Sequence, residues 1–138
     1  MKSKLLVILI PIFLTIGLFA SFTLSDDVPI MTKEQLNAML GNPDLVILDV
    51  RLSSDYFSSD LKIKAAVRPE MGGYIYETAL TYPPGKTFIF YCASPNEERS
   101  VVVLRGLLGL GRDGYTKAYV LKGGWEEWLK AGYPTEKK

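Results

Sequence analysis

Runs of consecutive apolar residues alternate along the chain with segments of helical spacing. Three runs are short, branched or aromatic, and typical of strands buried on both faces: residues 45–50, 87–91 and 118–121. Four segments are predicted to be helices: residues 33–40, 72–80, 101–110 and 125–131. Two weaker elements are a short helix or turn at 53–59 and a brief strand at 65–67. This alternation predicts an α/β domain built on a mainly parallel sheet.

Residues 5–24 form an uncharged, mostly apolar stretch that follows Lys2 and Lys4. A positive flank before an apolar segment is typical of a signal peptide, and a stretch of this length can also cross a bilayer as a helix. We therefore expect residues 1–25 to be a signal peptide or membrane anchor, and residues 26–138 to form one domain in the periplasm or cell envelope. An uncleaved segment would make the membrane a partner. A buried core helix is the alternative interpretation.

Composition narrows the chemistry that this domain can perform. The 138-residue chain has no histidine and one cysteine, which excludes Ser-His-Asp and Cys-His mechanisms, imidazole metal sites and an internal disulfide. The 16 basic and 15 acidic residues nearly cancel, so we expect no nucleic-acid binding driven by bulk charge. We expect neither a metal nor a cofactor. The remaining reactive groups are one thiol, carboxylates, hydroxyls, cationic side chains and backbone N–H groups.

The single cysteine, Cys92, follows the predicted strand 87–91 and precedes the predicted helix 101–110. It therefore lies at the carboxyl edge of the sheet, where parallel α/β proteins place their sites. Backbone N–H groups of the turn and the helix N-terminus favour an anion there, and a thiol in such a setting can have a pKa as low as about 3.5–7.5. A buried cysteine that acts as a small apolar side chain is the alternative, and position alone leaves both open.

The residues between Cys92 and the helix form a candidate anion-binding loop. Its members are Ala93, Ser94, Asn96, Glu97, Glu98, Arg99 and Ser100, together with Pro95, which has no N–H to donate. Ser100 is the predicted N-cap of the helix, and Arg99 adds a positive charge at the end of the loop. Glu97 and Glu98 place two negative charges where an anion would enter.

Asp49 and Arg51 lie at the end of the strand 45–50, on the same sheet edge as Cys92. For Asp49 we favour a structural hydrogen bond that ties two loops together, because polar groups at strand ends usually satisfy the backbone. Two roles are open for Arg51: steering an anion, or completing that structural pair. Gly123 and Gly124 predict a tight backbone turn near the site.

Five motifs in this order resemble the rhodanese-like domain family of sulfurtransferases. They are the strand that ends in Asp49-Val50-Arg51, the segment with Tyr56, Ile63 and Ala66, the pair Tyr91-Cys92, the pair Arg99-Ser100, and the segment Leu121, Gly123, Gly124, Trp125 with Pro134. The resemblance covers residues 31–134. Six residues, 93–98, separate Cys92 from Arg99, so the chain is similar to a long-loop variant of the family found in bacterial membrane or envelope proteins.

The resemblance implies a rhodanese-like fold with a mainly parallel central sheet of about five strands and helices on both faces. It also implies a sulfurtransferase whose Cys92 thiolate takes sulfane sulfur as a persulfide and passes it to a thiol or cyanide. The expected partners are a small sulfur-containing anion, or a protein persulfide or thiol. Two other functions stay open: an oxyanion enzyme of the same fold, such as a phosphatase or arsenate reductase, and a non-catalytic module that carries a persulfide or docks a partner.

Overall fold

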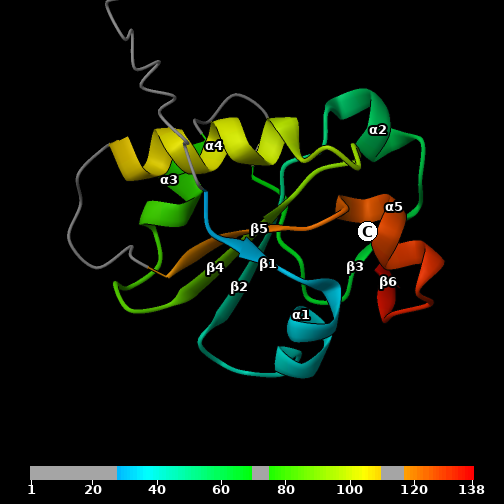
Figure 1. Cartoon of the computed structure of the whole chain (residues 1–138), viewed down its shortest axis with the longest axis horizontal. Coiled ribbons are helices and arrows are strands. Elements are labelled where there is room, and N and C mark those ends of the chain that lie inside the picture. Colours follow the sequence, from blue (N-terminus) through cyan, green and yellow to red (C-terminus); the bar gives the residue numbers. More distant parts are fainter. Residues whose placement is uncertain (1–27, 70–74, 110–116) are drawn as a thin grey trace, which may run out of the picture.

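A computed structural model describes residues 28–69, 75–109 and 117–138. Its central sheet has four strands, all parallel, in the order β1-β5-β4-β2 (Figure 1). The strands are β1 (Ile30–Met31), β2 (Leu45–Asp49), β4 (Thr87–Tyr91) and β5 (Ala118–Leu121). The predicted α/β class and parallel sheet are confirmed, and three of the four strands coincide with the apolar runs of the sequence.

The brief strand predicted at 65–67 is reduced to a single bridge beside β2. The N–H of Val67 donates to the Ile47 carbonyl at 2.8 Å, and the N–H of Asp49 donates to the Val67 carbonyl at 2.9 Å. Ala65 has a left-handed φ of 64°, so the chain is still turning two residues before the bridge. Pro69, two residues after it, has no N–H for a further ladder bond. A full fifth strand therefore does not form among the described residues.

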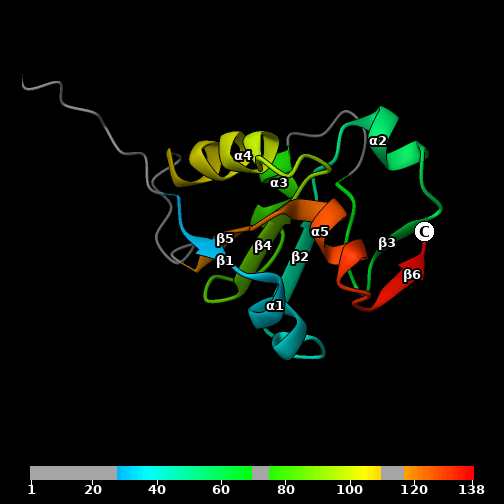
Figure 2. The same cartoon turned by 45° about the vertical axis from the view of Figure 1, so that its right-hand side comes forward.

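A second, two-stranded sheet was not predicted. Its antiparallel strands are β3 (Leu61–Ile63) and β6 (Thr135–Lys137), and Figure 2 shows them beside α5, apart from the central sheet. Lys62 pairs with Glu136 across the two strands, with 3.1 Å between Nζ and Oε1. Each strand has only three residues, too few for an alternating pattern to mark it in a sequence, and β6 is polar throughout.

The described residues form five helices around the sheet: α1 (Lys33–Met39), α2 (Ser53–Phe57), α3 (Ile75–Leu80), α4 (Glu98–Gly109) and α5 (Gly124–Lys130). The predicted capping box opens α1, because the Gln35 N–H donates to Thr32 Oγ1 and the Thr32 N–H donates to Gln35 Oε1. Helix α4 begins three residues before the predicted start at Val101. The predicted N-terminal part of α3, at 72–74, lies outside the described residues.

Helices cover both faces of the sheet, as predicted, and each face has its own core (Figure 1). Successive strand residues point to opposite faces, so each strand contributes alternate side chains to the two cores. The α3/α4 face buries Leu48, Phe90 and Leu104 with the other members of that cluster, and the α1/α5 face buries Ile47, Ile89 and Trp128 with its own. Both faces of β2 and β4 are buried, which explains why these strands are continuous apolar runs.

No helix in the described part of the chain is long and apolar enough to cross a membrane. The predicted signal peptide or anchor, residues 1–25, lies outside the described residues, so export stays a prediction.

Candidate active site

Cys92 immediately follows β4 at the carboxyl edge of the sheet, as predicted. Its side chain belongs to the core on the α3/α4 face, together with Val50 and Val103, and only 2% of the residue is exposed. The thiol donates a weak hydrogen bond to the Ser94 carbonyl, with 3.8 Å between sulfur and oxygen. Position left a buried and a reactive cysteine equally open, and the structure shows a thiol that is buried but polar in its contacts.

The loop after Cys92 folds back on Ser94. The Asn96 N–H donates to Ser94 Oγ and the Glu97 N–H donates to the Ser94 carbonyl, both at 3.2 Å. These two N–H groups were expected to face an anion, but they satisfy the loop itself. The α4 residues Glu98, Arg99 and Ser100 keep their N–H groups free of intrahelical bonds, as the first residues of any helix do. The last three residues of the loop therefore supply N–H groups that an anion could use, whereas those of Asn96 and Glu97 are already bonded.

Gly123 and Gly124 bring the start of α5 against the backbone of Cys92. The Trp125 N–H donates to the Cys92 carbonyl at 2.8 Å. A Cβ on Gly124 would lie 2.4 Å from that carbonyl oxygen and 3.1 Å from the Ser94 carbonyl oxygen. Both glycines also have left-handed φ angles. The predicted tight turn is confirmed. It lets the backbone at the start of α5 pack closely against the backbone of the cysteine loop.

The two acidic residues of the loop have different environments. Glu97 Oε1 accepts a 2.6 Å hydrogen bond from the Gly123 N–H, so this side chain fastens the loop to the start of α5. Glu97 also has a left-handed φ of 54°, an unusual conformation for a residue with a side chain. Glu98 is exposed in the first turn of α4. Repulsion of an entering anion by both carboxylates stays a prediction, but the two differ in place: Glu97 is a structural clasp between the loop and Gly123, and Glu98 is the more exposed.

Arg99 and Ser100 also differ from the prediction. Arg99 Nε donates to the Val50 carbonyl, which ties α4 to the residue after β2. The terminal amino groups of the Arg99 guanidinium can still donate hydrogen bonds to an anion. Ser100 is not the N-cap, because α4 begins at Glu98 and Ser100 is its third residue. Its side chain is fully buried.

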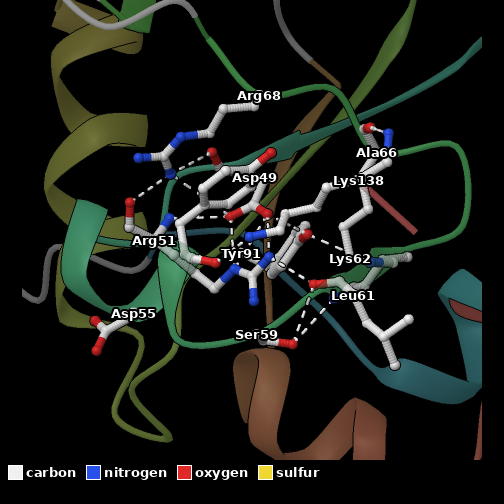
Figure 3. A network of polar contacts seen from close by, with 12 residues as sticks. Asp49, Arg51, Asp55, Ser59, Leu61, Lys62, Ala66, Arg68, Tyr91 and Lys138 are labelled. Carbon is white, nitrogen blue, oxygen red and sulfur yellow. Dashed lines mark hydrogen bonds and ion pairs between the residues drawn. The ribbon is translucent and has the colours of Figure 1, made fainter. Parts of the chain in front are cut away.

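Asp49 and Arg51 form a fully buried ion pair (Figure 3). Arg51 Nη2 lies 2.6 Å from Asp49 Oδ2, and Nε lies 2.9 Å from Oδ1. The Arg51 guanidinium also stacks 4.5 Å from the centre of the Trp125 ring. Burial lowers the pKa of Arg51, but the hydrogen bonds and charge of Asp49 outweigh this and raise it, so the guanidinium stays protonated.

The ion pair lies on the opposite face of the sheet from the Cys92 side chain. Asp49 accepts a 2.7 Å hydrogen bond from the Tyr91 hydroxyl, and Tyr91 belongs to the core on the α1/α5 face. Burial, with the Asp49 carboxylate close by, raises the pKa of Tyr91, so this hydroxyl remains a donor. Of the two roles open for Arg51, the structure supports the structural pair, because Asp49 and three aromatic rings surround its guanidinium.

Arg68, which was not singled out from the sequence, completes this network (Figure 3). Tyr56, named above only as part of a family motif, contributes its ring. Arg68 Nη1 donates to the Arg51 carbonyl and to the Asp49 carbonyl. Its guanidinium lies 4.4 Å from the centre of the Tyr56 ring, and Lys138 Nζ lies 4.1 Å from the same centre. These contacts join residues far apart in the chain. The network holds the turn after β2 in place. In that turn, the Val50 carbonyl accepts the hydrogen bond from Arg99 Nε.

No cluster of three or more potential metal ligands occurs among the described residues. At the candidate site the described residues supply a thiol, the N-terminus of α4 and the Arg99 side chain. A cysteine between a parallel strand and a helix places the domain among α/β proteins with a thiol-bearing loop.

The chain belongs to the rhodanese-like domain family, which it matches over residues 32–131. Among solved structures it is similar to the BH2092 protein from Bacillus halodurans, with 20% identity, a TM-score of 0.65, and coverage of 80% of this chain and 77% of that one. It is similar to the rhodanese-like domain of the Alr3790 protein from Anabaena sp., with 27% identity, a TM-score of 0.61 and coverage of 80% of each chain.

The fold also occurs within a larger enzyme. The chain is similar to thiosulfate sulfurtransferase from Pseudomonas aeruginosa, with 22% identity and a TM-score of 0.55, and the match covers 80% of this chain and 19% of that one. No curated protein matches the chain.

Proposed function

We propose that this protein is a sulfurtransferase that carries sulfane sulfur on Cys92. The Cys92 thiolate attacks the outer sulfur of a donor such as thiosulfate, and a new S–S bond forms. The S–S bond of thiosulfate breaks, and sulfite leaves with its electron pair. A thiolate acceptor or cyanide then attacks the outer sulfur of the persulfide, and the Cys92 thiolate is restored.

The observation that supports this proposal best is the place of the only thiol. Cys92 stands between the end of β4 and the first turn of α4, where N–H groups of the helix and the Arg99 side chain can hold an anion. Neither half-reaction needs a general base once the thiol is ionised, so the chemistry is compatible with a chain that has no histidine. Membership of the rhodanese-like family agrees with this function.

Burial of the thiol adds a requirement. Because Cys92 is only 2% exposed, we expect the loop 93–97 to open when a donor approaches the sulfur. The loop is held at one end by the Glu97–Gly123 hydrogen bond and at the other by the Trp125–Cys92 hydrogen bond. The first of these is a side-chain contact that can open without disturbing the sheet.

Intact-mass measurement after incubation with thiosulfate tests the proposal. We expect the wild-type protein to gain about 32 Da, the mass of one sulfur atom, and to lose it on adding a thiol reductant. Cys92→Ser should gain nothing while keeping its fold, because the change is nearly isosteric. The same protein is offered a phosphate ester and arsenate, since hydrolysis or reduction of these would identify an oxyanion enzyme instead. A folded protein that reacts with none of these, nor with a low-molecular-weight persulfide, would be a binding module.

The two glutamates of the loop should respond in opposite ways when each is replaced by glutamine. Glu98→Gln removes an exposed negative charge, so we expect faster sulfur uptake from thiosulfate, with a gain that shrinks when salt screens charges beyond about 8 Å. Glu97→Gln weakens the clasp on Gly123, so we expect it to lower the free energy of unfolding by about 1–2 kcal/mol. Urea unfolding and uptake rates at two salt concentrations measure both effects. Equal behaviour of the two variants would contradict the clasp.

A further inference from the structure

A cavity of about 370 Å³ lies where the cysteine loop meets the starts of α1 and α5. Its lining comes from three segments that are distant in sequence: residues 32–34 at the start of α1, Pro95 and Glu97 of the loop, and residues 122–123 with Glu127 at the start of α5. Pockets for small ligands have volumes of about 300–1,000 Å³, so this cavity has room for a small organic molecule. The chemistry proposed for Cys92 does not use it.

The cavity already contains a bound carboxylate, which belongs to the chain itself. Glu97 Oε1 accepts a 2.6 Å hydrogen bond from the Gly123 N–H, and both residues line the cavity. Glu97 makes this contact with a left-handed φ of 54°, a conformation that is unfavourable for a residue with a side chain. The Gly123 N–H is therefore a carboxylate site whose internal occupant is held at a conformational cost, and an external carboxylate can compete for it.

The charges around the cavity leave one cation available to such a ligand. Lys33 is paired with Glu127, with 3.3 Å between Nζ and Oε2, and Glu34 lies 3.8 Å from the same Nζ. Lys122 is exposed, precedes Gly123, and forms no ion pair with another described residue. Once Glu97 has withdrawn, the two lysines of the lining balance its two remaining glutamates. A ligand carboxylate at Gly123 can then pair with Lys122.

A chain of three hydrogen bonds connects the cavity to the Cys92 sulfur. The Gly123 N–H donates to the Glu97 side chain, the Glu97 N–H donates to the Ser94 carbonyl at 3.2 Å, and the Cys92 thiol donates to that same carbonyl at 3.8 Å. Loss of the first bond lets Glu97 leave its left-handed conformation, which turns its N–H away from Ser94. The segment that covers the thiol is then released, so occupancy of the cavity and access to Cys92 are coupled.

We propose that this cavity binds a small carboxylic acid in its ionised form, and that the ligand opens the loop over Cys92. The carboxylate takes the Gly123 N–H and pairs with Lys122, and the Glu97 side chain moves to solvent. Because coupling between two sites is reciprocal, a modification of Cys92 that holds the loop open also strengthens binding of the carboxylate. The inference goes beyond the proposed function, since it concerns a second site and applies to any reaction of the thiol.

The test uses the full chain and no sulfur donor. Glutarate is the probe, and glutaramide, its uncharged diamide, is the control at the same ionic strength. Binding is followed by the nuclear magnetic resonance shift of the Gly123 amide. Access to the thiol is followed by the rate of iodoacetamide alkylation, which reports Cys92 alone because the chain has no other cysteine. We expect glutarate to shift the amide and to speed alkylation about tenfold, both saturably, and glutaramide to do neither.

Three variants separate the parts of the proposal. Glu97→Ala removes the internal carboxylate, so glutarate should bind about tenfold more tightly and should no longer change alkylation, which is already fast. Lys122→Gln should weaken glutarate binding several-fold, because the ligand loses its cation. Lys137→Gln, which removes an exposed lysine of β6 away from the cavity, should bind glutarate as the wild type does. Tighter binding together with a lost response is not expected if Glu97 has only a structural role.

The outcomes that overturn the proposal are distinct from those that overturn sulfur transfer. No shift of the Gly123 amide with glutarate would show that the cavity is not a carboxylate site, and binding without faster alkylation would show that it does not control the loop. The wild-type comparison of glutarate with glutaramide decides this even if Glu97→Ala does not fold. If glutarate speeds alkylation but the protein takes no sulfur from any donor, the cavity keeps its role and the proposed function falls. Sulfur uptake without any response to glutarate removes only the role of the cavity.

Discussion

Asp49→Asn is expected to lower the free energy of unfolding by about 3–5 kcal/mol. The substitution removes the charge that neutralises Arg51, whose guanidinium is fully buried and has no route to solvent. An unpaired charge in such a place must be desolvated without compensation. The loss would be a large share of the total stability of a small domain, which is about 5–15 kcal/mol. Urea unfolding measures this loss of free energy, provided that the m-value, the slope of the free energy against urea concentration, is the same for both proteins.

The matched control for this prediction is Glu126→Gln, which breaks an ion pair on the surface. Glu126 and Lys130 are both more than half exposed, with 3.1 Å between oxygen and nitrogen. Exposed pairs contribute less than about 1 kcal/mol, so this variant should unfold close to the wild type. If Asp49→Asn cost no more than Glu126→Gln, the buried pair would not hold the turn after β2.

Gly124→Ala is expected to cost about 3 kcal/mol or more and to abolish sulfur uptake by Cys92. The new methyl group would lie 2.4 Å from the Cys92 carbonyl oxygen, and backbone atoms cannot move aside as the end of a flexible side chain can. Relief of the clash must separate α5 from the cysteine loop and break the hydrogen bond from the Trp125 N–H. Urea unfolding and the mass gain with thiosulfate report the two effects.

Gly132→Ala is the matched control. It carries the cost of a left-handed alanine without the steric clash that Gly124→Ala also introduces. Gly132 has a similar left-handed φ of 68°, but a Cβ there would meet no atom within 4 Å. This variant should therefore lose only about 1 kcal/mol, the cost of a left-handed alanine, and should take up sulfur normally. A Gly124→Ala protein that behaved like Gly132→Ala would show that the loop tolerates displacement from α5.

Local chemistry in the sequence was sufficient for much of the fold. The runs 45–50 and 87–91 are apolar on both faces, and only a strand covered on both sides has that pattern. Thr32 and Gln35 lie close enough in sequence to cap a helix by themselves, so α1 could be placed from the capping box alone. Cys92 at the junction of a strand and a helix, and the glycine pair 123–124, followed from the same order of elements.

Other parts depended on pairings between distant segments. Strands β3 and β6 pair although Ile63 and its partner Thr135 are 72 positions apart in the chain (135 − 63), and β1 has only two residues that pair with β5. The start of α4 moved to Glu98 because Glu97 adopts a left-handed φ and gives its carboxylate to Gly123, a contact between residues 26 positions apart. No local pattern in a sequence contains that contact.

The sequence by itself determined the class of fold, the place of the only thiol and the absence of histidine chemistry, because these depend on residue type and on local periodicity. Only the tertiary structure decided which face each site residue occupies. The parallel register pairs Asp49 with Tyr91, and alternation along the strands then sends Asp49 to the α1/α5 face while Cys92 points to the α3/α4 face. A shift of one residue in that register would exchange the faces, and register is fixed by packing across the sheet rather than by the order of residues along the chain.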